Sequence, residues 1–198
     1  MTLAERLRIA LRRGHAAEVI LEKADVEGLR SEPGVPFAAA AVLIAVTDRP
    51  EPGLILTQRT AHLRKHAGQI AFPGGRVDDT DKDVTDAALR EAEEELAMPR
   101  DQVDVIGVSD SFRTYTGFEV TPVLGVVPPG LSLIPHEHEV ADWFEMPLEY
   151  ALDADNQVRR WIEFQGSQRP YYEIMWQDRR IWGVTAAILV NLRKRLGL

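Results

Sequence analysis

The segment from Phe72 to Met98 does more than any other part of the sequence to constrain the fold. It joins a Pro-Gly-Gly turn to a stretch that has the composition of a helix and carries many acidic side chains. In a helix with about 3.6 residues per turn, Glu91, Glu94 and Glu95 stand at positions i, i+3 and i+4 and therefore share one face. Carboxylates at these spacings destabilise a helix by roughly 0.2 to 0.5 kcal/mol per pair, so this face needs an offsetting interaction.

A bound divalent cation would provide that interaction. Mg2+ and Mn2+ prefer oxygen ligands, and carboxylates one helical turn apart can hold such an ion while water and substrate phosphates complete its shell. The alternative is an ordinary solvated helix face. The two glycines immediately upstream favour the cation, because glycine lets the backbone approach a ligand closely.

Charge is divided unevenly around this segment. The chain of 198 residues has a formal net charge of -8, which argues against a large nucleic-acid surface. Residues 56–76 carry +4 from four basic side chains and no acids, whereas residues 77–96 carry -7 from nine acids and two bases. A cationic stretch beside an anionic one suits a polyanionic small molecule, met by arginines on one side and by a carboxylate-bound cation on the other.

Composition predicts a cytoplasmic protein without membrane spans. The longest apolar run, residues 37–46, has ten residues, whereas a spanning helix needs about 20. The N-terminal residues are interrupted by charge too often to form the apolar core of a signal peptide. Cysteine is absent, which excludes disulfides and cysteine nucleophiles and agrees with a reducing compartment.

The length and the hydrophobic pattern predict one main domain of the α/β class, with a mixed β-sheet sandwiched between helices. An amphipathic helix at residues 2–13 and a connector at 27–36 lead into it, so we divide the chain into residues 1–35, packed on the domain, and residues 36–198. Within the domain, helices are expected at 84–96, 146–152 and 183–195. Strands are expected at 38–47, 54–58, 103–109, 119–127, 140–145, 158–164 and 171–176, the first two as an antiparallel hairpin.

Other motifs are weaker. The run from Asp78 to Asp83 lacks the glycine and the final glutamate of a calcium-binding loop, so a solvated loop is expected. His136 and His138 lack the H-E-x-x-H arrangement and are expected on the surface. At strand spacing Glu137 and Glu139 point the same way, and one of them either reaches a site from a loop or lies at a solvated strand end. The chain has neither a P-loop nor a G-x-S-x-G elbow, so kinase-like and serine-hydrolase functions lack their central parts.

The sequence REAEEELAM at residues 90–98 resembles the core of the Nudix box, the signature of hydrolases that act on nucleoside diphosphates linked to another moiety. Ala97 stands where the box usually has glycine, and Gly75 lies fifteen residues before Arg90, one more than usual. The longer loop leaves the acid that the family has midway unassigned among three candidates, Asp78, Asp79 and Asp81.

The stretch ILTQRTAHLRKHAGQIAFPGG, residues 55–75, is similar to the extra motif that marks the coenzyme A pyrophosphatase branch of the Nudix hydrolases. Segments 116–125, 139–148 and 180–189 also look like that branch. The resemblance implies hydrolysis of coenzyme A, and of some thioester or disulfide derivatives, to 3',5'-ADP and a 4'-phosphopantetheine product. The alternatives are another nucleotide substrate, such as ADP-ribose or a nucleoside triphosphate, and a non-catalytic nucleotide-sensing module, which would be expected to have lost box glutamates.

The resemblance also implies roles for individual residues. Mg2+ or Mn2+ would be held by the box glutamates and one backbone carbonyl, namely Glu91, Glu94, Glu95 and Gly75. Arg90 would orient the glutamates, and either a box glutamate such as Glu94 or Glu139 would take the proton from the attacking water. The substrate would be met by Arg59, Arg64, Lys65, Gly68 and Gly74. The expected partner is a small molecule, coenzyme A or a related nucleotide, with no nucleic acid and no membrane, and a homodimer is left open.

Overall fold

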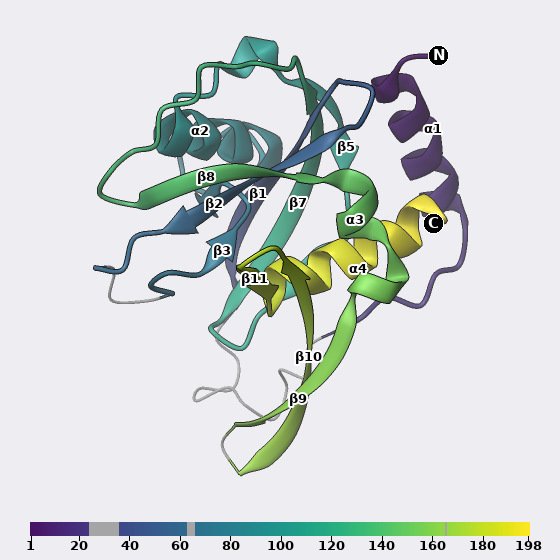
Figure 1. Cartoon of the computed structure of the whole chain (residues 1–198), viewed down its shortest axis with the longest axis vertical. Coiled ribbons are helices and arrows are strands. Elements are labelled where there is room, and N and C mark those ends of the chain that lie inside the picture. Colours follow the sequence, from purple (N-terminus) through teal and green to yellow (C-terminus); the bar gives the residue numbers. More distant parts are fainter. Residues whose placement is uncertain (24–35, 63–65, 165) are drawn as a thin grey trace.

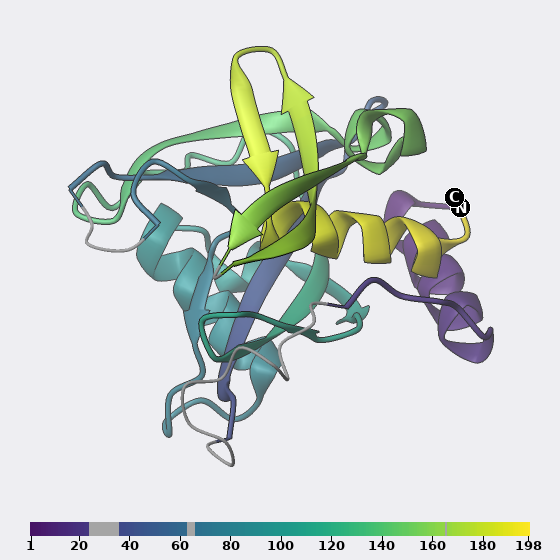
Figure 2. The same ribbon diagram turned by 90° about the horizontal axis from the view of Figure 1, so that it is seen from below.

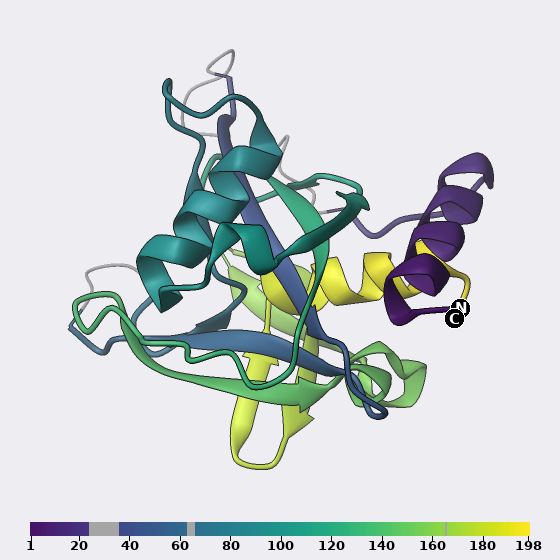
Figure 3. The same ribbon diagram turned by 90° about the horizontal axis from the view of Figure 1, so that it is seen from above.

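The computed structural model describes residues 1–23, 36–62, 66–164 and 166–198. In this part of the chain eight strands form one mixed sheet, and three more form a second, antiparallel sheet. Helices α2 and α4 lie on opposite sides of the large sheet (Figures 1 and 3). The α/β architecture expected from the sequence, a mixed sheet between helices, is confirmed.

The predicted elements are present with their ends within four residues of the expected positions, and β3, β4, β6 and β11 are additional. The helices are α1 (Leu3–Ala16), α2 (Val84–Leu96), α3 (Leu148–Leu152) and α4 (Val184–Leu196). The large sheet contains β1 (Ala38–Thr47), β2 (Gly53–Arg59), β3 (Ile70–Ala71), β4 (Gly74–Arg76), β5 (Asp104–Val108), β6 (Phe112–Arg113), β7 (Phe118–Val127) and β8 (Val140–Pro147). The small sheet contains β9 (Val158–Phe164), β10 (Ser167–Trp176) and β11 (Arg179–Trp182).

Strand β1 is the central strand of the large sheet. It pairs in parallel with β7 along all ten of its residues. The expected hairpin with β2 forms only at its closed end, through Val46 with Leu54 and Thr47 with Gly53. Beyond that point β1 and β2 diverge, while β2 pairs with β8 along its whole length, from Gly53 to Arg59.

The Pro-Gly-Gly segment crosses the split between β1 and β2. Strand β3 pairs with β2, and β4 pairs with β1 through Gly74 opposite Val42 and Gly75 opposite Ala41. The prediction of a turn at these glycines is therefore wrong, since both lie in a strand. Their position carries the chain from one half of the split sheet to the other, directly under α2.

Both faces of β1 are buried, which explains why its sequence is a continuous apolar run. Ala41, Leu43 and Ala45 belong to the core cluster beneath α2. Ile44 and Val46 point to the opposite face and join the larger cluster that includes α1 and α4. Helix α2 therefore packs against the centre of the sheet through small side chains. Their size determines how close the acidic face lies to the sheet.

Helix α1 packs on α4 and β5, and Figure 2 shows α4 running from the small sheet to α1. Thr2 and Glu5 form a capping box at its first turn. The buried guanidinium of Arg195 donates to both carboxylate oxygens of Asp110 at 2.7 Å and to the carbonyl of Gly14, which ties α1 to α4. Residues 24–35, which include most of the predicted connector, lie outside the described residues. In the part of the chain that is described, no helix combines the length and hydropathy needed to cross a bilayer.

Candidate active site

The guanidinium of Arg90 organises the acidic face of α2. Its Nη1 atom donates to Glu91 at 3.0 Å and to Glu94 at 3.1 Å. Its Nη2 atom donates to the carbonyl of Arg76 at 3.0 Å, which ties the helix to β4. Hydrogen bonds between charged partners are shorter and stronger than neutral ones, so Arg90 holds both glutamates in place.

Asp81 accepts hydrogen bonds from the other side of the same guanidinium. Nε and Nη2 of Arg90 donate to its two oxygens at 2.9 and 3.0 Å, and the Asp81 side chain is only 2% exposed. These hydrogen bonds, together with one from the backbone N–H of Asp78, hold the pKa of Asp81 below its usual range. The expectation of a solvated loop at 78–83 is therefore wrong at this residue. Of the three acids that the sequence left as candidates, Asp81 is the one that is buried against Arg90. Asp78, by contrast, is 62% exposed and lies 3.7 Å from Arg90.

Glu95 is the most buried carboxylate of the face, with 4% of its surface exposed. It accepts a hydrogen bond from the backbone N–H of Gly74 at 3.2 Å, and the nearest cation is Arg59 at 3.9 Å. The pKa of Glu95 is raised to about 8, mainly by burial and to a smaller extent by the charges of Glu91 and Glu139, while the hydrogen bond from Gly74 and the charge of Arg59 act in the opposite direction. Burial also raises the pKa of Glu91. The site thus gathers more negative charge than its own cations offset.

Glycine is required on β4 because backbone and carboxylate meet there. A Cβ atom on Gly75 would lie 2.4 to 2.7 Å from the carboxylate atoms of Glu91. A Cβ atom on Gly74 would lie 2.4 Å from the carbonyl oxygen of Ala41 on the neighbouring strand. The two glycines therefore let the strand lie directly against the acidic face of α2.

Glu139 reaches the site from the loop before β8. Backbone N–H groups of Ile134 and His136 donate to the carbonyls of Leu96 and Glu95, both at 2.8 Å. The Thr60 N–H donates to the carbonyl of Glu139 at 2.9 Å. These bonds place Glu139 where its charge raises the pKa of Glu95. Residues 137–139 form a turn, so the expected strand alternation of Glu137 and Glu139 is wrong although Glu139 does approach the site.

The donor set suits a hard cation. Among the described residues, no three His, Cys, Asp or Glu side chains surround a common point as ligands. The glutamates do not converge on one point because Glu91 and Glu94 are hydrogen-bonded to the guanidinium of Arg90. The available donors are all oxygen, and the buried Glu95, whose pKa is raised mainly by burial, has its cationic neighbour Arg59 only at 3.9 Å. This chemistry fits Mg2+ or Mn2+ and excludes a thiolate site.

A cavity of about 690 Å³ opens beside the acidic face. Arg59, Gly74 and Gly75 line its charged end, where the Nε atom of Arg59 is buried and has no hydrogen-bond partner among the described residues. The rest of the wall is mainly apolar and comes from β1, β7, the small sheet and α4. It includes Val42, Phe118, Ile162, Pro170, Val184 and Ile188.

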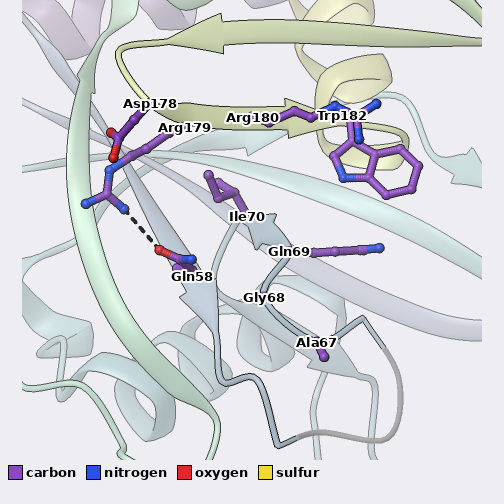
Figure 4. A pocket seen from close by; sticks show the side chains of 9 residues that line it. All are labelled: Gln58, Ala67, Gly68, Gln69, Ile70, Asp178, Arg179, Arg180 and Trp182. Carbon is purple, nitrogen blue, oxygen red and sulfur yellow. Dashed lines mark hydrogen bonds between the residues drawn. The ribbon is translucent and has the colours of Figure 1, made fainter.

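A second pocket of about 450 Å³ adjoins this cavity and is more polar. Figure 4 shows Gln58 and Arg179 on one side and Gln69 and Trp182 on the other. Arg179 donates to Gln58 at 3.3 Å across the floor of the pocket. Gly68 lies at its rim, in the segment that leads into β3.

The structure brings most of the predicted residues together around one cavity. Arg59, Gly74 and Gly75 line it, the three glutamates and Arg90 lie beside it, and Gly68 belongs to the adjoining pocket. Arg64 and Lys65 lie outside the described residues. Sequence reasoning left Asp81 as one of three candidate acids and did not single out Arg169, Tyr171 or Trp182. These three residues approach the cavity through the pairing of the small sheet, for which the sequence carries no local signal.

The carboxylate-rich helix face, the glycine strand beneath it and the cavity next to that strand form one continuous site. The family model described as NUDIX domain matches residues 36–165. The chain belongs to the Nudix hydrolase family and is an enzyme. Members of this family hydrolyse nucleoside diphosphate derivatives, act on small molecules and generally use divalent ions such as Mg2+ or Mn2+.

Two bacterial relatives are similar over most of their length. The protein named uncharacterized Nudix hydrolase NudL in Cronobacter sakazakii is 51% identical over 158 residues, which cover 80% of this chain and 82% of the relative. The protein of the same name in Escherichia coli O7:K1 is 49% identical over 159 residues, which cover 80% and 83%. The crystal structure of a Nudix hydrolase from M. smegmatis, RenU, shares the fold, with a TM-score of 0.50, 21% identity and coverage of 58% of this chain and 73% of that one.

Proposed function

We propose that this Nudix hydrolase cleaves the diphosphate bond of coenzyme A, and of some of its thioester or disulfide derivatives, to 3',5'-ADP and 4'-phosphopantetheine. The observation that carries the proposal is the position of Arg59. This residue belongs to the segment 55–75, which resembles the coenzyme A branch at its L-T, Arg64, Gly68 and F-P-G-G positions, although Arg59 itself stands where that motif has threonine. Its guanidinium lies at the charged end of the cavity, 3.9 Å from Glu95. The cavity of about 690 Å³ has the size of a site for a ligand much larger than diphosphate alone.

The chain's own residues bind and orient the reacting group. Arg59 offers a guanidinium to the phosphate oxygens, a pairing for which arginine geometry is well suited. Arg90 holds Glu91 and Glu94, and Asp81 holds Arg90 from the opposite side. Mg2+ or Mn2+, held by Glu91, Glu94, Glu95 and the carbonyl of Gly75, would neutralise phosphate charge and lower the pKa of water at the site.

The proton of the attacking water goes to a carboxylate. We assign this role to Glu139, whose loop, residues 134–139, is hydrogen-bonded to the end of α2, with a box glutamate such as Glu94 as the alternative. The water oxygen forms a bond to phosphorus, and the bond from that phosphorus to the bridging oxygen breaks. The bridging oxygen leaves with the second phosphate as an anion.

Product analysis tests the proposal. Purified protein is incubated with Mg2+ and, separately, with coenzyme A, ADP-ribose and nucleoside triphosphates, and the products are identified by mass spectrometry. Coenzyme A should yield 3',5'-ADP and 4'-phosphopantetheine. If coenzyme A survives while ADP-ribose is cleaved, the substrate assignment is wrong and the chain acts on another nucleoside diphosphate derivative.

A further inference from the structure

Two pockets of opposite character meet at one side of the acidic face. The apolar cavity of about 690 Å³ and the polar pocket of about 450 Å³ share Gln69, Ile70 and Trp182 as a common wall. The diphosphate-facing residues Arg59 and Gly75 lie at one end of the larger cavity. A substrate with a diphosphate in its middle would therefore extend two arms into two different environments.

The wall of the larger cavity suits a saturated chain. Val42, Phe118, Ile162, Val184 and Ile188 present only hydrocarbon to it. Arg169 also lines this wall, with its guanidinium 6.0 Å from the centre of the Tyr115 ring. A nucleobase against the aliphatic side chains would leave most of its polar edges without partners, which costs free energy, whereas the alkyl part of an acyl group loses nothing there. The amides and the hydroxyl of pantetheine need the polar residues of the same wall, among them Thr114 and Thr116.

The smaller pocket suits a nucleotide. Gln58 and Gln69 contribute amide groups whose oxygens are hydrogen-bonded to Arg179 and His66 and whose NH2 groups can donate to a ligand. The guanidinium of Arg180 lies over the Trp182 ring at 4.9 Å. Arg179 and Arg180 also line this pocket, and each is oriented by a carboxylate, Asp142 for Arg179 and Glu173 for Arg180. Amide groups and two guanidinium groups match a purine that carries a phosphate.

We propose that the apolar cavity takes the pantetheine arm with its acyl group and that the polar pocket takes the 3'-phosphoadenosine arm, which makes the enzyme selective for acyl thioesters over free coenzyme A. This assignment rests on the proposed function. Each methylene that leaves water for the apolar wall should raise kcat/KM by up to about 4-fold, through a lower KM, until the cavity is full.

A chain-length series tests the assignment. We would measure kcat/KM for free coenzyme A and its acetyl, butyryl, hexanoyl and octanoyl thioesters in the wild type and in Val184→Phe. Val184 lines the cavity at the first turn of α4, away from the acidic face, so the larger ring should fill the space for the chain. The wild type should show the rise with chain length and Val184→Phe should lose it. The matched variant Val184→Ala should keep the rise, which shows that filling the cavity, and not altering the residue, removes it.

The other arm is tested by product inhibition. Arg180→Gln should raise the inhibition constant of 3',5'-ADP by about 10-fold and leave the chain-length rise unchanged, because a guanidinium–phosphate pair contributes roughly a factor of ten or more. Thermal melts of all three variants establish that each is folded.

The outcomes separate the two proposals. An enzyme that cleaves coenzyme A with the same kcat/KM for every thioester would overturn the assignment of the arms alone. The same holds if Val184→Phe weakens 3',5'-ADP inhibition while the chain-length rise persists, because the nucleotide would then occupy the apolar cavity. A wild type that cleaves no coenzyme A compound would overturn the proposed function and this assignment with it.

Discussion

The acidic face of α2, which lies against the cavity-lining residues Arg59 and Gly75, and the small sheet, which lines the cavity itself, are built in different ways. On α2, charged groups hold one another: Arg90 bonds Asp81, Glu91 and Glu94 at distances between 2.9 and 3.1 Å. On the small sheet, the wall consists of aromatic, aliphatic and cationic side chains on strands that project from the body of the molecule (Figure 1). The charged groups of α2 are fixed and would act on the diphosphate. The small sheet would instead provide a contact surface for the rest of the substrate. Changes on α2 should therefore lower kcat, and changes on the small sheet should raise KM.

The largest effect is expected for Glu94→Gln. The Glu94 side chain is 59% exposed, so this near-isosteric change should leave the fold intact while removing a charged oxygen from the donor set. We expect kcat to fall by at least about 1,000-fold, because phosphoryl charge is then poorly neutralised. The matched control is Glu93→Gln on the same helix, whose carboxylate instead pairs with Arg100 at 2.6 Å. Near-normal turnover of Glu94→Gln, measured in steady-state assays, would contradict the cation site.

The next effect is on stability and comes from Glu95. Its pKa in the folded protein is about 8, above the ordinary value of 4.5, so the folded state keeps this proton more tightly than the unfolded chain. Stability should be complete below about pH 4.5 and decrease as pH rises towards 8. Since one pKa unit corresponds to about 1.4 kcal/mol, the loss should amount to a few kcal/mol at most.

Urea unfolding in the presence of a chelator, at pH 5, 6.5 and 8, measures this loss. Glu95→Gln, which cannot ionise, should lose less free energy of unfolding over the same range than the wild type. Added Mg2+ should restore stability at pH 8 in the wild type and have a smaller effect in the variant. Equal pH dependence in both proteins would show that Glu95 is not the titrating group.

A smaller effect on kcat is expected for Asp81→Asn. The amide retains one acceptor for Arg90 but loses the charge and the second oxygen, so the guanidinium is no longer fixed on both sides. Loss of a residue that orients ligands typically costs about 10- to 100-fold, and we expect this range in kcat with little change in KM. Asp79→Asn, two residues away and exposed, is the control and should behave as the wild type. An equal loss in both variants would mean that Arg90 does not need Asp81.

The smallest effect is expected on the wall, for Trp182→Leu. Trp182 lines both pockets, so its loss should raise KM about 3- to 10-fold while kcat stays within about 3-fold. Trp161→Leu is the control, because Trp161 belongs to the same sheet but is 59% exposed and lines neither pocket. A fall in kcat as large as that of Asp81→Asn would break the distinction between the two regions.

The acidic helix could be predicted well because its signals are local. Its bounds, residues 84–96, follow from the helical period and from Pro99 beyond its end. The arrangement of Glu91, Glu94 and Glu95 on one side of the helix is a consequence of that same period. Arg90 lies on the same helix, and its contact with Glu94 one turn away follows from the helical period as well.

Sheet pairing could not be predicted in the same way. Strands β1 and β2 looked like a complete hairpin, but β1 pairs in parallel with β7, about 80 residues later in the chain (Ala38 opposite Phe118). The Pro-Gly-Gly segment became a strand only because β1 and β2 separate and leave edges for β3 and β4. An apolar run does not indicate which strand it will pair with, because the backbone hydrogen bonds are of the same kind in every pairing.

By itself, the sequence determined which residues of α2 carry the charge and that they share one face, since helix geometry depends on neighbours within two turns. Only the tertiary structure decided which acid meets Arg90. Asp78, Asp79 and Asp81 are equivalent in the sequence, and the path of the loop between β4 and α2 buries Asp81 against the guanidinium. It also decided that Trp182 lines the cavity and that the charge of Glu139 acts on Glu95, because contacts between residues far apart in the chain depend on the packing of whole elements.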